Sequence, residues 1–104
     1  MKTTNQTAGE TAKKTITRSE LFENLGTFRS VTIEAPNYFT IHFANGEAMQ
    51  SYSSLIGVSY KGTYYFTADH DCSTTTNKQV KNWCGYSAEE RRQGLANGKF
   101  INVI

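Results

Sequence analysis

The sequence has few of the residues that build disulfide frameworks, rigid linkers or membrane spans. Its 104 residues include two cysteines and one proline, and no apolar run approaches the roughly 18 to 20 residues that cross a bilayer. Two cysteines are too few for the disulfide framework of a small secreted domain, and a reducing cytosol would keep Cys72 and Cys84 as thiols. Residues 1–15 lack the apolar stretch of a signal peptide. These absences predict a protein that stays in the cytoplasm and does not cross a membrane.

An excess of charge of one sign is also missing. Eleven Lys and Arg against nine Asp and Glu give a net charge of +2, and no basic block stands out as the footprint of a nucleic acid. A chain of 104 residues has room for one small domain. Near residue 16 the composition changes from a polar segment to a chain that contains regularly spaced apolar residues. We therefore expect a flexible tail over residues 1–15 and a single domain over residues 16–104.

Capping residues and apolar spacing predict three short helices. A Ser or Thr followed three residues later by Glu has the spacing of a capping box, and this pattern precedes residues 18–25 and 88–97. A stripe of apolar residues at positions i, i+3 and i+4 includes Trp83. This stripe predicts a third helix over residues 75–84.

Alternation of apolar and polar residues predicts strands between residues 30 and 68. Asn45-Gly46 is the strongest turn signal, because a type I′ hairpin needs a positive φ at both central residues. Lys61-Gly62 predicts a second tight turn, and the apolar residues 100–104 are able to add an edge strand. We expect an α+β domain, with an antiparallel meander sheet of four to five strands and short N-terminal and C-terminal helices packed on one face.

Side chains able to do chemistry are sparse and match no familiar spacing. The densest cluster is Asp69-His70-Asp71-Cys72, with Cys84 farther along the chain and His42 on a strand. Zinc ligands come in tight pairs, which this spacing does not provide, and no glycine-rich phosphate loop is present. Cys72 would act as a nucleophile only if an imidazole lay beside it. We therefore expect no catalytic residue, metal or cofactor, and keep a small metal- or Cys-dependent hydrolase as an alternative.

Aromatic and basic residues are better candidates for a binding site. If Phe39, Ile41 and Phe43 face the core, the residues that alternate with them face the other side of the sheet. By the same alternation, Tyr65 points to the opposite face from Tyr64 and Phe66. Such a face is suited to stacking bases or docking a partner. The C-terminal helices add several cations, for which a solvated surface is the simpler interpretation. The candidate binding residues are Tyr38, His42, Tyr65, Lys78, Arg91 and Arg92.

Short motifs along the chain resemble a known group of proteins. In order, the motifs are Asn45-Gly46, Gln50-Ser51-Tyr52, Leu55-Ile56, Ser73-Thr74-Thr75-Thr76, Lys78 and Trp83. Over about residues 16–98 this order resembles small uncharacterised proteins of tailed phages and gut bacteria that are grouped as a domain of unknown function. The resemblance implies an accessory protein of a phage or mobile element. It supplies no catalytic residue.

Three functions follow from these patterns. The first is a non-enzymatic accessory binding protein of a phage, prophage or mobile element, which contacts a host or phage macromolecule through its sheet face or C-terminal helices. Inhibition of a host defence system is one version of it. The alternatives are a small nucleic-acid-binding module and the small hydrolase. We expect a protein or nucleic-acid partner and either a monomer or a homodimer, since residues 100–104 pair as easily across a dimer as within one chain.

Overall fold

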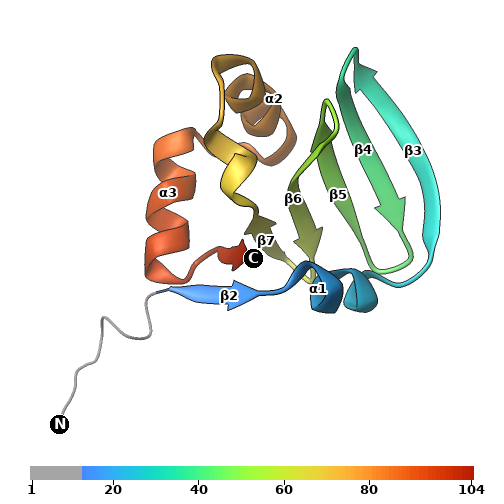
Figure 1. Cartoon of the computed structure of the whole chain (residues 1–104), viewed down its shortest axis with the longest axis horizontal. Helices are drawn as coiled ribbons and strands as arrows, with labels where there is room; N and C mark the ends of the chain where they lie inside the picture. The colour runs from blue at the N-terminus through green and yellow to red at the C-terminus, as the bar shows by residue number, and fades with distance from the viewer. Residues whose placement is uncertain (1–12) are drawn as a thin grey trace, which may run out of the picture.

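The structure is a computed structural model that describes residues 13–104. Within this range, seven strands form one sheet in the order β2-β8-β7-β6-β5-β4-β3, shown in Figure 1. The strands are β2 (Lys14–Ile16), β3 (Phe28–Ala35), β4 (Tyr38–Phe43), β5 (Gly46–Ser51), β6 (Ser54–Tyr60), β7 (Thr63–Phe66) and β8 (Ile101–Val103). The helices are α1 (Arg18–Leu25), α2 (Thr74–Cys84) and α3 (Ala88–Asn97), with a short 3-10 helix, η2 (Ala68–Asp71). None of the helices in the described range is long and apolar enough to cross a membrane.

The sheet is mixed, so the expected antiparallel meander of four to five strands is wrong. The strands β3 to β7 are successive antiparallel neighbours. Strand β8, however, lies between β7 and β2 and runs parallel to both. Residues 100–104 therefore contribute an interior strand and not an edge. The two added strands have three residues each, which is too short for apolar alternation to reveal them.

The last two residues of the expected tail, Lys14 and Thr15, belong to this sheet. Residues 1–12 lie outside the described part of the chain, and Lys14 and Thr15 pair with Ile101 and Asn102 of β8. The first described strand is thus joined to the last.

The two predicted hairpin turns differ in geometry. Lys61 and Gly62 have φ values of 50° and 76°, as a type I′ turn requires. Asn45 and Gly46 have no positive φ, so the predicted type I′ turn is wrong there, although β4 and β5 do pair antiparallel. The Asn45 amide instead donates to the carbonyl of the last residue of α1, at 3.0 Å. Glycine is needed at position 46 because a Cβ atom would lie 2.4 Å from the carbonyl oxygen of Ser59.

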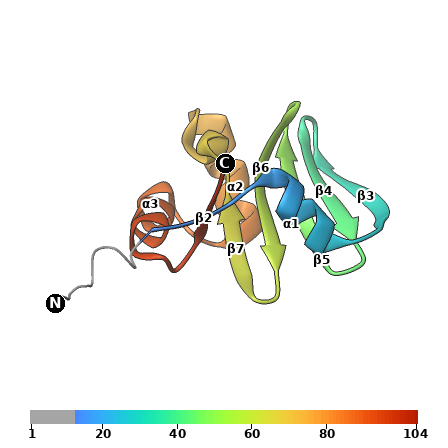
Figure 2. The same cartoon turned by 60° about the horizontal axis from the view of Figure 1, so that its bottom comes forward.

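Helices cover both faces of the sheet, which corrects the expectation that they pack on one. Ala48 and Met49 are neighbours on β5, both are fully buried, and they belong to two different apolar clusters. Leu21 and Leu25 of α1 belong to the cluster on the side of Ala48, and Val80 of α2 belongs to the cluster on the side of Met49. We call these sides the α1 face and the α2 face; Figure 2 shows α1 in front of the sheet.

Candidate functional site

The two tyrosines expected on an exposed aromatic face are both buried. Tyr38 is 6% exposed and packs on the α2 face, whereas Tyr65 is 8% exposed and packs on the α1 face. The Tyr38 hydroxyl donates to Asn82 Oδ1 at 2.8 Å. Burial raises the pKa of both tyrosines. The expected outward face is absent because helices pack against the sheet from both sides within the described residues.

The four remaining candidates do not share one surface. His42 Nε2 lies 2.8 Å from Thr32 Oγ1, near the outer edge of the sheet. Lys78 is exposed on α2. Arg92 is exposed on α3 and pairs with Asp71. Arg91, for which a solvated helix surface was the simplest interpretation, is completely buried.

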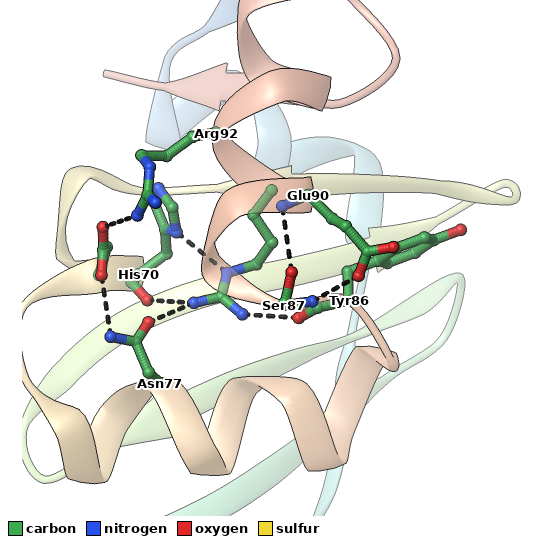
Figure 3. A network of polar contacts seen from close by, with 8 residues as sticks. His70, Asn77, Tyr86, Ser87, Glu90 and Arg92 are labelled. Carbon is green, nitrogen blue, oxygen red and sulfur yellow. Dashed lines mark hydrogen bonds and ion pairs between the residues drawn. The ribbon is translucent and has the colours of Figure 1, made fainter.

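Arg91 joins three segments of the α2 face through its guanidinium. Its Nε donates to His70 Nδ1 at 3.0 Å and a terminal nitrogen donates to the Tyr86 carbonyl at 2.7 Å. The other terminal nitrogen donates to the His70 carbonyl at 2.9 Å and to Asn77 Oδ1. Figure 3 shows His70, Asn77 and Tyr86 gathered around this group. We call this set the Arg91 junction, because it connects η2, α2 and the start of α3.

A carboxylate lies just beyond the Arg91 junction. Asn77 Nδ2 donates to one oxygen of Asp71 at 2.8 Å, and Arg92 pairs with the other oxygen. The hydrogen bond from Asn77, followed by that from Arg92, lowers the pKa of Asp71. Asn77 therefore bridges Asp71 and Arg91, since its Nδ2 donates to the carboxylate and its Oδ1 accepts from the guanidinium, which stays protonated as arginine does in proteins.

The histidine of the Arg91 junction is held neutral. His70 is 6% exposed, and burial, followed by the charge of Arg91, lowers its pKa. Because Arg91 donates to Nδ1, that nitrogen is an acceptor and the ring proton is on Nε2. His70 thus serves as a hydrogen-bond acceptor inside the fold.

The two cysteines and the histidines do not assemble into a nucleophilic site. Cys72 is exposed, and its Sγ lies 3.5 Å from Thr76 Oγ1. Burial raises the pKa of the Cys84 thiol, which is opposite to what a thiolate nucleophile needs. The Nδ1 atom of His70 is occupied by Arg91. Among residues 13–104, no group of three or more His, Cys, Asp or Glu side chains is placed to hold a metal ion.

The motif residues lie mainly where α2 contacts β5. Ser51 is 2% exposed, and its hydroxyl donates to Gln79 Oε1 at 2.6 Å and lies 3.3 Å from Thr76 Oγ1. Trp83 Nε1 donates to Glu47 Oε2 at 3.0 Å. These contacts hold α2 on the sheet, which gives the motifs a structural role.

Three of the five exposed large apolar side chains of the described residues lie on β3, at the edge of the sheet. Phe28, Val31 and Ile33 are 55%, 48% and 71% exposed. The register with β4 places Val31 opposite Ile41 and Ile33 opposite Phe39. These side chains therefore extend the α1 face beyond the part that α1 covers. Figure 1 shows β3 as the outermost strand, on the side of the sheet away from α3.

The other face of β3 is polar, and its central part is regular. Ser30 and Thr32 are exposed and lie opposite His42 and Thr40, on the α2 face. Register shifts fall between Phe28 and Ser30 and between Ile33 and Ala35, so that the regular segment is 30–33. We define the β3 surface as Phe28, Val31 and Ile33 together with Arg29, Ser30, Thr32 and Glu34.

Sequence reasoning missed the β3 surface because alternation was taken to indicate burial. Val31 and Ile33 alternate with polar residues as in a half-buried strand, yet among residues 13–104 only β4 pairs with β3, on one side. The signal that marks β3 as an edge strand is Pro36, which directly follows it, together with the charged residues Arg29 and Glu34 within the strand.

Compared with known proteins, the chain matches no family model, no curated protein and no solved structure.

Proposed function

We propose that this protein is a non-enzymatic protein-binding module that binds its partner at the β3 surface. The observation that carries the proposal is the combination of three exposed apolar side chains with the backbone of an edge strand. An extended segment adds to such an edge through main-chain hydrogen bonds, and alternate side chains provide specificity. Soluble proteins usually protect a strand edge of this length, so an eight-residue edge with exposed apolar side chains is suited to binding.

The chemistry of the β3 surface favours a protein partner over a nucleic acid. Binding of single strands relies on a positively charged groove and on exposed rings that stack with bases. The β3 surface carries one cation, Arg29, and one carboxylate, Glu34. The rings of Tyr38 and Tyr65 are buried, and the charge of Arg91 is used inside the fold.

The resemblance to phage proteins supplies the biological setting of the proposal. In that setting the chain is an accessory protein of a phage, prophage or mobile element that acts in the cytoplasm on a host or phage macromolecule. Inhibition of a host defence system is one version. The Arg91 junction gives His70 and Arg91 structural roles, and the α2–β5 contacts give Ser51 and Trp83 structural roles. These roles support a function by contact at the β3 surface.

Photocrosslinking in the natural host tests the surface directly. A photoreactive phenylalanine analogue replaces Arg29 on the β3 surface, and the same analogue replaces Lys78 on exposed α2 as the matched control. We expect protein crosslinks from position 29 that Ile33→Asp removes, and different or no crosslinks from position 78. Crosslinks to nucleic acid alone, or the same products from both positions, would contradict the proposal.

A further inference from the structure

We infer that the partner bound by the β3 surface is a second copy of this chain, paired antiparallel through β3 about a two-fold axis at Thr32. The inference rests on the proposed function, because it names the partner for the same surface. The resulting dimer would have one continuous sheet that runs through both subunits.

Length and exposure single out β3 as the edge that pairs. In the part of the chain that the structure describes, the edge strands of the sheet are β2 with three residues and β3 with eight. The β3 side chains from Phe28 to Glu34 are all exposed, whereas Ile16 of β2 is partly buried. A strand edge that is both long and exposed pairs readily with another chain unless charges, bulges or proline prevent it. The register shifts of β3 lie near its two ends, and Pro36 follows its last residue. Residues 30–33 therefore remain regular.

The side-chain pattern of β3 is complementary to itself. Two identical strands that pair antiparallel are related by a two-fold axis, and directly opposite residues lie on the same face of the sheet. With the axis at Thr32, Val31 lies opposite the partner's Ile33, and Ile33 lies opposite the partner's Val31. Four apolar side chains that are exposed in the single chain then form one cluster on the α1 face. On the α2 face, Thr32 lies opposite the partner's Thr32.

The register shifted toward the start of β3 is less favourable than the one centred on Thr32. With the axis at Val31, Ile33 would lie opposite the partner's Arg29, so that an exposed apolar side chain would face a charge and the apolar cluster would be divided. Cross-strand pairs of this kind do not contribute the stabilisation that apolar pairs provide.

Charge is compatible with the antiparallel direction. Arg29 lies near the start of β3 and Glu34 lies near its end. Antiparallel pairing about Thr32 sets Arg29 opposite the partner's Ala35 and Glu34 opposite the partner's Ser30, whereas parallel pairing in register would align like charges, which is destabilising. The interface is small, so we expect a dimer that dissociates on dilution.

A charge exchange at Thr32 tests the inference. Thr32→Glu and Thr32→Lys each place like charges directly opposite one another across the axis, which is destabilising for a strand pair. The Thr32 side chain is exposed, so both variants are expected to fold, and circular dichroism checks this. Lys78→Glu on α2 is the matched control for a change of surface charge.

Sedimentation equilibrium over a wide range of concentration measures the outcome. For the wild-type chain and Lys78→Glu we expect the mass to rise from 11.7 kDa to about twice that value as concentration increases. Each Thr32 variant alone should stay at 11.7 kDa, and an equal mixture of the two should regain the dimer. This restoration is the result that only pairing at Thr32 produces.

Two results would overturn the inference. One is a wild-type chain that stays monomeric at every concentration, and the other is a dimer that the Thr32 variants leave intact or that their mixture does not restore. If the wild-type chain is monomeric while position 29 crosslinks to another protein, the dimer is excluded and the proposed function stands. If position 29 gives no protein crosslink, the proposed function itself fails.

Discussion

Replacing Arg91 tests whether the Arg91 junction holds the α2 face together. Arg91→Met keeps an unbranched side chain of similar length but removes every donor. Four acceptors then lose their partner, namely His70 Nδ1, the carbonyls of His70 and Tyr86, and Asn77 Oδ1. Because the guanidinium is completely buried, water does not replace it without opening the structure.

The expected loss of stability is set by two opposing effects. Hydrogen bonds to charged groups contribute about 1.5–3 kcal/mol each, so a simple sum over four bonds would reach most of the total stability of a small domain. Arg91→Met also removes the cost of burying a charge, which offsets part of that sum. Removing one partner from a buried ionic network typically costs about 3–5 kcal/mol, and we expect a loss in this range. Arg91→Lys keeps the charge but loses the planar fork of donors, so we expect about 2 kcal/mol.

Urea unfolding measures these losses with two probes. Far-ultraviolet circular dichroism reports the helices, and fluorescence reports Trp83, the single tryptophan. Trp83 packs edge-on against Tyr64 on the α2 face, with ring centroids 5.3 Å apart. Arg92→Met is the matched control, because the Arg92 side chain is 54% exposed and its pair with Asp71 is worth at most about 1 kcal/mol.

Equal losses for Arg91→Met and Arg92→Met would refute the reasoning, as would a loss below about 1 kcal/mol for Arg91→Met. If Arg91→Met does not fold at all, Arg91→Lys supplies the measurement. In that case a stability within about 0.5 kcal/mol of wild type would show that the fork geometry is unimportant.

Three further predictions follow from individual contacts. Gly94→Ala would place its Cβ atom 2.2 Å from a ring carbon of buried Phe100. Despite the better helix propensity of Ala, we expect a net loss of about 1–2 kcal/mol in the free energy of unfolding, measured by thermal unfolding. The additional loss should be smaller when Phe100→Leu is already present. His70 has a pKa lowered by burial and by Arg91, so the unfolded chain binds its proton more readily and stability should fall as pH drops below the ordinary His pKa of about 6.5. Urea midpoints for wild type and His70→Asn across that range check this, and an unchanged slope in His70→Asn would contradict it. Ser51→Ala removes the hydroxyl that donates to Gln79, so we expect a loss of about 1–2 kcal/mol, against less than about 0.5 kcal/mol for exposed Ser53→Ala in the same denaturation assay.

The helices were predictable because capping chemistry is local. The side chains of Thr17 and Ser87 accept hydrogen bonds from the amides of Glu20 and Glu90, as the capping-box spacing predicts. At Ser87 the capping box is complete, because the Glu90 side chain also accepts from the Ser87 amide at 2.8 Å. Such contacts span three residues, so the sequence contains all the information they need.

The sheet was less predictable because its pairing depends on distant residues. Lys14 pairs with Ile101, and nothing near either residue indicates the other. The faces of β4 were also ambiguous, since Tyr38 alternates with Phe39 and an aromatic residue fits either a core or a surface. Asn82, which satisfies the Tyr38 hydroxyl, is remote in sequence, and a buried tyrosine with a satisfied hydroxyl is readily accommodated.

The role of Arg91 was hidden for a similar reason. Arg91 and Arg92 are consecutive, and charge alone does not distinguish the one that turns inward. The distinction comes from η2, which presents the carbonyl and Nδ1 of His70 to α3. Those acceptors lie 21 residues away in the chain, so only the assembled fold brings them to the guanidinium.

The placement of β8 between β7 and β2 bears on the order of folding. Residues 14–16 pair with 101–103, which in turn pair with β7. The contact between Lys14 and Ile101 closes a loop that contains nearly all of the described chain, and contacts of such long sequence separation form slowly. The hairpins from β3 to β7 need only short loops. Strand β2, the first strand of the described residues, is therefore expected to be the last to join the sheet, and its amides should be the first in the sheet to exchange with solvent.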